Sequence, residues 1–183
     1  MLTLVAYLAL IFALLLFLIS ISIYTLFLIY SSLMGSPYVP TRQKEAELIL
    51  AEAGLKKGKH LIELGCGDGR ILRTAAKKYQ LQGLGIDVNL FLILIARTKA
   101  RWQKLKTIKF QTKNIFATDI RQADYVYLFL MPALIAKLKP KLEKELKPKT
   151  IVISHGFAIK GWKNKQYKLL DRRPFSTYYY RLT

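Results

Sequence analysis

The eleven residues HLIELGCGDGR, from His60 to Arg70, decide the fold of this chain. The first five form a short apolar run that predicts a buried β-strand, His60 to Leu64. The next five hold three glycines, which allow a sharp turn and let a ligand approach the main chain where no Cβ stands in the way. A helix is expected to begin at Gly69. A strand, a glycine turn and a helix in this order form the place where an open α/β sheet binds its ligand.

Strands and helices alternate on the C-terminal side of this turn. Further strands are expected at 82–88, 107–112, 124–130 and 150–155, and helices at 89–104 and 133–146. One more helix is expected on the N-terminal side of the turn, at 42–53. Such alternation predicts a parallel sheet with helices on both faces. The segments 167–171 and 177–182 are separated by Arg172, Arg173 and Pro174, which predicts a hairpin. We therefore expect an α/β fold with a Rossmann-like, seven-stranded, mostly parallel sheet that ends in a C-terminal antiparallel hairpin.

The N-terminal segment is of a different kind. The first 41 residues contain no Lys, Arg, Asp or Glu, and the run from Leu2 to Tyr30 is almost entirely apolar. As a helix, this run would be about 43 Å long, against about 30 Å of bilayer hydrocarbon. A cleaved signal peptide is the alternative, but it has a basic start and a shorter apolar stretch. We expect one N-terminal transmembrane helix at 1–34.

The domain organisation follows from this contrast. Gly35, Pro37 and Pro40 break the helix and predict a connector at 35–41, after which Thr41 is expected to cap the first helix of a single domain at 42–183. All the basic residues lie C-terminal to the apolar segment. The positive-inside rule therefore predicts a single-pass membrane protein with this domain on the cytoplasmic side.

Composition excludes several classes of function. A single cysteine, Cys66, excludes a disulfide framework and a cysteine-based zinc site, and the two histidines make a histidine-rich metal site unexpected. No metal is predicted. The third glycine of a dinucleotide-binding G-x-G-x-x-G pattern would fall on Arg70, which weakens that interpretation, and no phosphate-binding G-x-x-x-x-G-K-[ST] loop exists.

The stretch from Glu63 to Gly69, acidic-x-Gly-x-Gly-x-Gly, resembles instead the glycine signature of class I S-adenosylmethionine-dependent methyltransferases. The resemblance implies that the cofactor S-adenosyl-L-methionine binds at the turn, with Asp87 at the end of the next strand accepting from the ribose hydroxyl groups. Asn114 and Ile115, after the third strand, correspond to the position that holds the adenine. The predicted cofactor-binding residues are Glu63, Gly65, Cys66, Gly67, Asp68, Gly69, Asp87, Asn114 and Ile115.

Several further segments resemble one branch of that superfamily. They are the apolar leader, Ser36 to Thr41 (SPYVPT), the glycine turn, and Gly85 to Asn89 (GIDVN). The branch comprises the seven-β-strand lysine methyltransferases anchored in mitochondrial membranes, which modify the ATP synthase c subunit and the adenine nucleotide translocase, and their prokaryotic relatives. The resemblance implies that residues 35–41 cover the cofactor, with Tyr38 and Thr41 as the catalytic pair near the transferring methyl group.

The acceptor is less firmly indicated. Residues 129–132 are Phe-Leu-Met-Pro, where enzymes that methylate adenine or glutamine carry Asn/Asp-Pro-Pro-Tyr/Phe, which argues against those two acceptors. The family resemblance implies instead a lysine amine of a membrane-associated protein. A membrane lipid or quinone, RNA, or a non-catalytic adaptor role remain alternatives. With an apolar segment close by, the net charge of +19 favours an anionic membrane surface as a further partner. Nucleic acid, for which no motif is present, and solubility alone are the alternatives that are not favoured.

Overall fold

The computed structural model describes residues 2–33 and 39–183 of the chain. Two compact units separate, with the first ending at Tyr38 and the second running from Val39 to Thr183. The first unit is one helix, α1 (Leu2–Leu33). Within it, Thr3–Leu26 has a mean hydropathy of 3.0, and length and composition make it the one candidate membrane span in the described part of the chain. A core helix or a signal sequence can meet the same criteria.

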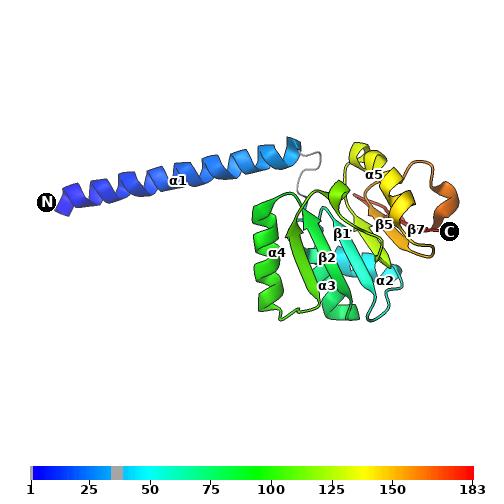
Figure 1. Ribbon diagram of the computed structural model, residues 1–183. Helices are drawn as coiled ribbons and strands as arrows, with labels where there is room; N and C mark the ends of the chain where they lie inside the picture. The colour runs from blue at the N-terminus through cyan, green and yellow to red at the C-terminus, as the bar shows by residue number, and fades with distance from the viewer. Residues whose placement is uncertain (1, 34–38) are drawn as a thin grey trace. The chain divides into compact units, whose positions relative to one another are not determined.

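The second unit is built on a seven-stranded sheet with the order β3-β2-β1-β4-β5-β7-β6 (Figure 1). The five strands β3, β2, β1, β4 and β5 are parallel to one another. Strand β7 pairs antiparallel with β5, and β6 pairs antiparallel with β7 to form the hairpin. The strands are β1 (His60–Leu64), β2 (Gln82–Asp87), β3 (Ile108–Thr112), β4 (Tyr125–Leu128), β5 (Ile151–His155), β6 (Gln166–Leu170) and β7 (Thr177–Arg181). The predicted α/β fold with its antiparallel hairpin is confirmed.

Helices cover both faces of the sheet, and the sheet separates the core into two clusters of buried residues. Helices α2 (Gln43–Glu52), α3 (Arg70–Tyr79) and α4 (Leu90–Trp102) pack with Leu61, Tyr127 and Ile153 on one face. Helix α5 (Pro132–Glu145) packs on the other face with Ile62, Val126 and Val152, because neighbouring residues of a strand point to opposite sides. Leu138 and Leu142 of α5 are fully buried, as their four-residue spacing predicts.

The start of α2 differs from its prediction. Arg42, not Thr41, stands at the position before the helix, and its side chain makes no capping hydrogen bond. Thr41 lies one residue too early to cap, and its carbonyl instead accepts a hydrogen bond from Arg70 Nη1 at 2.6 Å. This contact ties the entry to the domain to the first residue of α3.

Candidate functional site

The glycine turn between β1 and α3 lies at the carboxyl end of the parallel strands. Gly65, Gly67 and Gly69 have φ values of 75°, 52° and 70°, a region that favours glycine over residues with a Cβ. The N–H groups of Gly65 and Cys66 donate to the Ile86 carbonyl at 2.8 and 2.9 Å. The turn is therefore fastened to the end of β2, the strand that carries Asp87.

Asp87 joins this turn to the start of α4. Its Oδ2 accepts from the Gly67 N–H and its Oδ1 from the Asn89 N–H, both at 2.9 Å. Burial raises the pKa of Asp87 even though backbone N–H groups from Asn89, Gly67 and Val88 counteract the rise. Each carboxylate oxygen has a second lone pair, which leaves the group able to accept two hydroxyl groups.

Asp68, a residue of the glycine turn, forms ion pairs with three basic side chains. Its Oδ2 lies 2.7 Å from Lys99 Nζ on α4 and within 3.6 Å of guanidinium nitrogens of Arg70 and Arg73. Burial disfavours the charged carboxylate, but the Lys99 ammonium and the two guanidinium groups outweigh it and lower the pKa of Asp68. These partners point to a role in holding the turn between α3 and α4, and a contact with the cofactor stays a prediction.

Glu63 and Cys66 are buried within the same region. Glu63 is 3 % exposed, and its Oε2 accepts from the Leu72 N–H of α3 at 3.0 Å. Burial raises the pKa of Glu63 well above its usual range, and a nearby cation would lower it again. Burial also raises the pKa of the Cys66 thiol, which gives Cys66 the character of a small packing residue and not of a nucleophile.

Asn114 and Ile115 follow β3, at the same edge of the sheet. The Asn114 Oδ1 accepts from the Phe116 N–H at 2.9 Å and so begins a short 3₁₀ helix, Ile115–Ala117. The oxygen expected to accept from the adenine amine therefore already has one partner, and its second lone pair is the one left for a ligand. Ile115 is 7 % exposed, at the boundary between core and surface.

The predicted catalytic pair is only half described. Tyr38 lies outside the described residues. The Thr41 side chain faces the hydroxyl of Tyr127 on β4, which is buried and has no well-formed hydrogen bond to the described residues. Sequence reasoning did not single out Tyr127, because an aromatic residue in a buried strand is typical of a core. The one feature of the sequence that could have pointed to Tyr127 is its polar hydroxyl group, which lies in a strand expected to be buried.

His155, at the end of β5, is buried and not open to a ligand. Its Nδ1 lies 2.8 Å from the Thr177 hydroxyl and its Nε2 lies 3.8 Å from a Glu45 carboxylate oxygen. The ring packs edge-on against Phe129 and Phe175. Burial lowers the pKa of His155 to about 4, so the ring is neutral at physiological pH.

The polar groups at this edge of the sheet suit a nucleoside that has vicinal hydroxyl groups and carries a cationic amine. Asp87 offers acceptors, the glycine turn has no Cβ at three of its positions, and Glu63 offers a buried carboxyl whose raised pKa a nearby cation would lower. Among the described residues no group of three or more His, Cys, Asp and Glu side chains could hold a metal ion.

Comparisons with known proteins identify a methyltransferase family. The family model of the ANTKMT methyltransferase domain matches residues 63–166. The chain is 40% identical over 132 residues to a protein-lysine N-methyltransferase of Saccharolobus islandicus. The matched region is 71% of this chain and 82% of that relative. It is 30% identical over 128 residues to the human lysine N-methyltransferase of the ATP synthase c subunit, which covers 69% of this chain and 54% of that protein.

Among solved structures, the chain is similar to an RNA methyltransferase from Salinibacter ruber crystallised with S-adenosyl-L-homocysteine. The TM-score is 0.75 at 31% sequence identity, and the match covers 79% of this chain and 94% of that one. The chain thus spans most of the archaeal and bacterial proteins but about half the length of the human relative.

Proposed function

Because the chain belongs to the ANTKMT methyltransferase family, we propose that it is a membrane-anchored protein-lysine N-methyltransferase that acts on a membrane-associated protein. The family's methyl donor is S-adenosylmethionine, whose sulfonium makes the attached methyl group open to displacement by a neutral amine. The observation that carries the proposal is the pair of hydrogen bonds by which Asp87 joins the glycine turn to the start of α4, because it fixes a carboxylate beside the turn where a ribose would need an acceptor.

The residues of the chain would divide the work of holding the donor. Asp87 would accept from the two ribose hydroxyl groups, and Gly65, Gly67 and Gly69 would let the amino-acid part lie against the backbone. Glu63 would face the cationic amine, whose positive charge lowers the raised carboxyl pKa and so favours the charged carboxylate. Asn114 and Ile115 would border the adenine.

Thr41 would border the approach of the acceptor amine, with the buried hydroxyl of Tyr127 behind it. Burial raises the pKa of Tyr127 well above its usual range, so the phenol keeps its proton and acts as a hydrogen-bonding group, not as a base. The acceptor amine therefore has to lose its proton before transfer. The rate of transfer should rise with pH as the free lysine fraction grows.

Lysine in a membrane-associated protein is supported by the relatives' names and by α1. Relatives are named for lysine methylation of the ATP synthase c subunit and of the adenine nucleotide translocase. Helix α1 has the length and hydropathy of a membrane span, and the charge asymmetry favours a single pass with the domain on the cytoplasmic side. An anionic membrane surface would then be a second partner for the basic domain.

The acceptor class can be read from a transfer assay with tritiated S-adenosylmethionine on membranes of a strain that lacks this protein. We expect the full chain to label protein and not lipid or RNA, and Asp87→Ala to label nothing. Label in the lipid fraction, or in RNA that nuclease removes, would reject lysine as the acceptor.

RNA is the second candidate acceptor, because the similar Salinibacter structure is described as an RNA methyltransferase. It would be favoured by RNA binding that weakens steeply as salt increases. The absence of a recognised nucleic-acid motif and the names of the other relatives place it second.

A further inference from the structure

Helix α4 presents an apolar face to solvent as well as to the core. Leu92, Ile93, Ala96 and Ala100 point inward and are at most 5 % exposed. The opposite side carries four large apolar side chains, namely Leu90, Leu94, Ile95 and Trp102, with exposed fractions of 51, 47, 43 and 84 %. A helix on the surface of a soluble domain normally turns polar residues outward, so an outer face made of these four side chains is unusual for a soluble domain.

We propose that this outer face of α4 lies in the headgroup region of an anionic lipid bilayer, as a second membrane contact in addition to α1. The proposal rests on the proposed function insofar as α1 brings the domain to a membrane. It deepens that function by naming the surface that would hold the site against the bilayer.

The charge around α4 is one-sided. Residues 88–118, which include α4 and β3, contain seven Lys and Arg residues and no Asp or Glu. Arg97, Lys99 and Arg101 border the apolar face along α4 itself. A helix with a broad apolar side flanked by basic residues is the type that binds in the plane of an anionic membrane.

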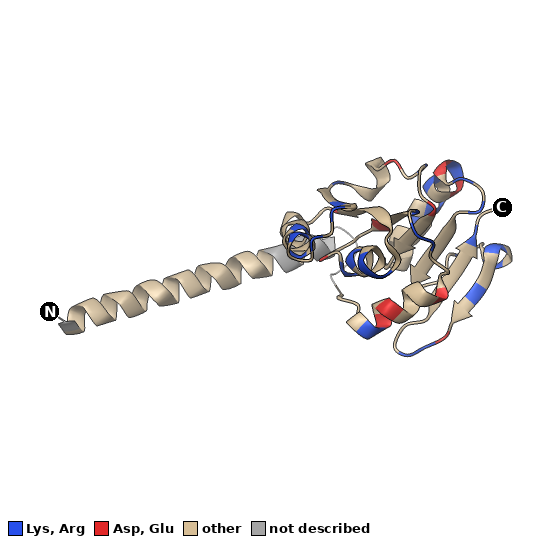
Figure 2. Ribbon diagram, turned by 90° about the horizontal axis from the view of Figure 1, so that it is seen from below, with Lys and Arg blue, Asp and Glu red and all other residues tan. Residues whose placement is uncertain are grey.

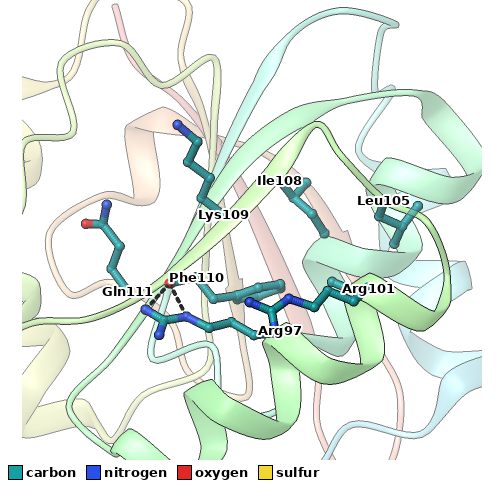
Figure 3. Close-up of a pocket in the computed structure, with 8 residues that line it drawn as sticks. Arg97, Arg101, Leu105, Ile108, Lys109, Phe110 and Gln111 are labelled. Carbon is teal, nitrogen blue, oxygen red and sulfur yellow. Dashed lines mark hydrogen bonds between the residues drawn. The ribbon is translucent and has the colours of Figure 1, made fainter.

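A pocket behind α4 adds a place for a phosphate group. Arg97, Arg101 and Gln111 line it together with Phe110 and Ile108 (Figure 3). The Arg97 guanidinium is held against the edge strand by two hydrogen bonds to the Phe110 carbonyl, at 3.0 and 2.8 Å. Arg101 lies beside it on α4, while Lys109 leaves β3 on the other side. Two guanidinium groups at one edge suit the anionic headgroup of a lipid.

A bilayer accounts for the apolar side chains better than other occupants do. Single-stranded nucleic acid stacks on aromatic rings and uses basic grooves, but it has no use for Leu90, Leu94 and Ile95. The nine residues between α1 and α2 span at most about 30 Å even when fully extended, so a chain anchored by α1 keeps its domain near the membrane surface.

The position of α4 links this surface to the site. The helix begins right after Asn89, two residues beyond Asp87, and Lys99 bonds Asp68 beneath the turn. Docking of α4 would therefore place the cofactor turn within a helix length of the lipid surface. A lysine that projects from a membrane protein just outside the bilayer is an acceptor within that range.

Trp102 makes the proposal testable in the full chain. The only other tryptophan, Trp162, is 1 % exposed in the core, so contact quenching reports on Trp102. The full chain would be reconstituted into phosphatidylcholine vesicles with or without phosphatidylglycerol, each with brominated acyl chains. The emission that is lost in Trp102→Phe is the part that belongs to Trp102. We expect brominated anionic vesicles to quench most of this part, and brominated neutral vesicles to quench less of it.

Two matched variants locate the contact. Arg101→Gln combined with Lys109→Gln should reduce quenching on anionic vesicles, and Leu94→Gln combined with Ile95→Gln should reduce it on both kinds, with S-adenosylmethionine affinity unchanged in each. Unchanged Trp102 emission in brominated anionic vesicles would overturn the proposal. So would an emission change that only RNA produces, or Trp102 shielded from both lipid and acrylamide in a dimer. Quenching without any methyl transfer would instead reject the proposed function and leave this surface in place.

Discussion

Asp87 has two tasks in this account, since it closes the glycine turn and is the acceptor for the ribose. Both of its oxygens bind backbone N–H groups on different elements, which fixes the direction in which the remaining lone pairs point. Such a fixed carboxylate loses little freedom when a ligand binds, so its hydrogen bonds contribute more of their strength to affinity.

Replacing Asp87 with Ala should weaken the binding of S-adenosylmethionine at least about 100-fold. Two hydrogen bonds to a charged group are worth about 3 kcal/mol or more, which is roughly a 100-fold loss of affinity. Titration calorimetry on the wild type and the variant checks this. Asp119→Ala is the control, since Asp119 is a surface acid paired with Arg121. Equal affinity in the wild type and Asp87→Ala would remove Asp87 from the site.

His155 should make the domain sensitive to acid. Its folded pKa of about 4 lies below the ordinary value of 6.5, so the neutral ring contributes stability that is present above pH 6.5 and lost as the pH falls through 4. Between neutral pH and pH 4 the loss from this residue is about 3 kcal/mol, reduced by any attraction to Glu45. Urea unfolding of residues 39–183 should show this extra loss in the wild type relative to His155→Gln. Parallel pH profiles of the two proteins would argue against it.

At the scale of elements, the glycine turn also depends on how closely α4 and β3 approach it. A Cβ added at Gly69 would lie 2.3 Å from the Phe110 ring and 3.1 Å from Ala96 Cβ. The left-handed backbone at Gly69 would be strained as well. This turn can therefore exist in its observed form only with glycine at its last position.

Gly69→Ala should lower the free energy of unfolding by about 3 kcal/mol, from backbone strain and overpacking together. Gly58→Ala is a matched control, because Gly58 has a φ of 76° but nothing within 4 Å of an added Cβ. The control should lose only about 1 kcal/mol. Denaturant unfolding of both variants gives the comparison, and equal losses would show that Phe110 yields to the added methyl group.

Most elements could be predicted from local patterns, since strands of apolar residues and helices with spaced leucines have clear signatures. The outer face of α4 could not be. Its start, LFLILIA, is apolar at every position, so periodicity does not reveal which side faces the core. The cap of α2 was misplaced by one residue for a related reason, since Thr41 is used through its carbonyl by a distant arginine. The burial of His155 also depends on partners from other elements.

At the scale of the whole molecule, charge and hydropathy divide the chain into two parts. Figure 2 shows Lys and Arg spread over many elements of the domain and none on α1. The uncharged helix and the basic domain are each suited to a different layer of a membrane, hydrocarbon for the first and anionic headgroups for the second.

Removal of residues 1–34, which leaves the predicted cofactor-covering segment and Tyr38 in place, should separate these contributions. We expect the remaining domain to bind S-adenosylmethionine as tightly as the full chain, because every described contact at the site lies within residues 39–183. Its methylation of a membrane substrate should fall at least 10-fold, as the local concentration given by the anchor is lost. Transfer assays on membranes measure this ratio. Equal rates would show that α1 serves only to direct the protein to its location.

The central claim, methylation of lysine in a membrane-associated protein, is tested most directly by peptide mass spectrometry of membranes from strains with and without this protein. The account predicts a lysine that carries one or more methyl groups in the strain with the wild type, and that is unmodified both in the strain without it and in one that carries Asp87→Ala. Identical lysine methylation in all three strains would contradict the account.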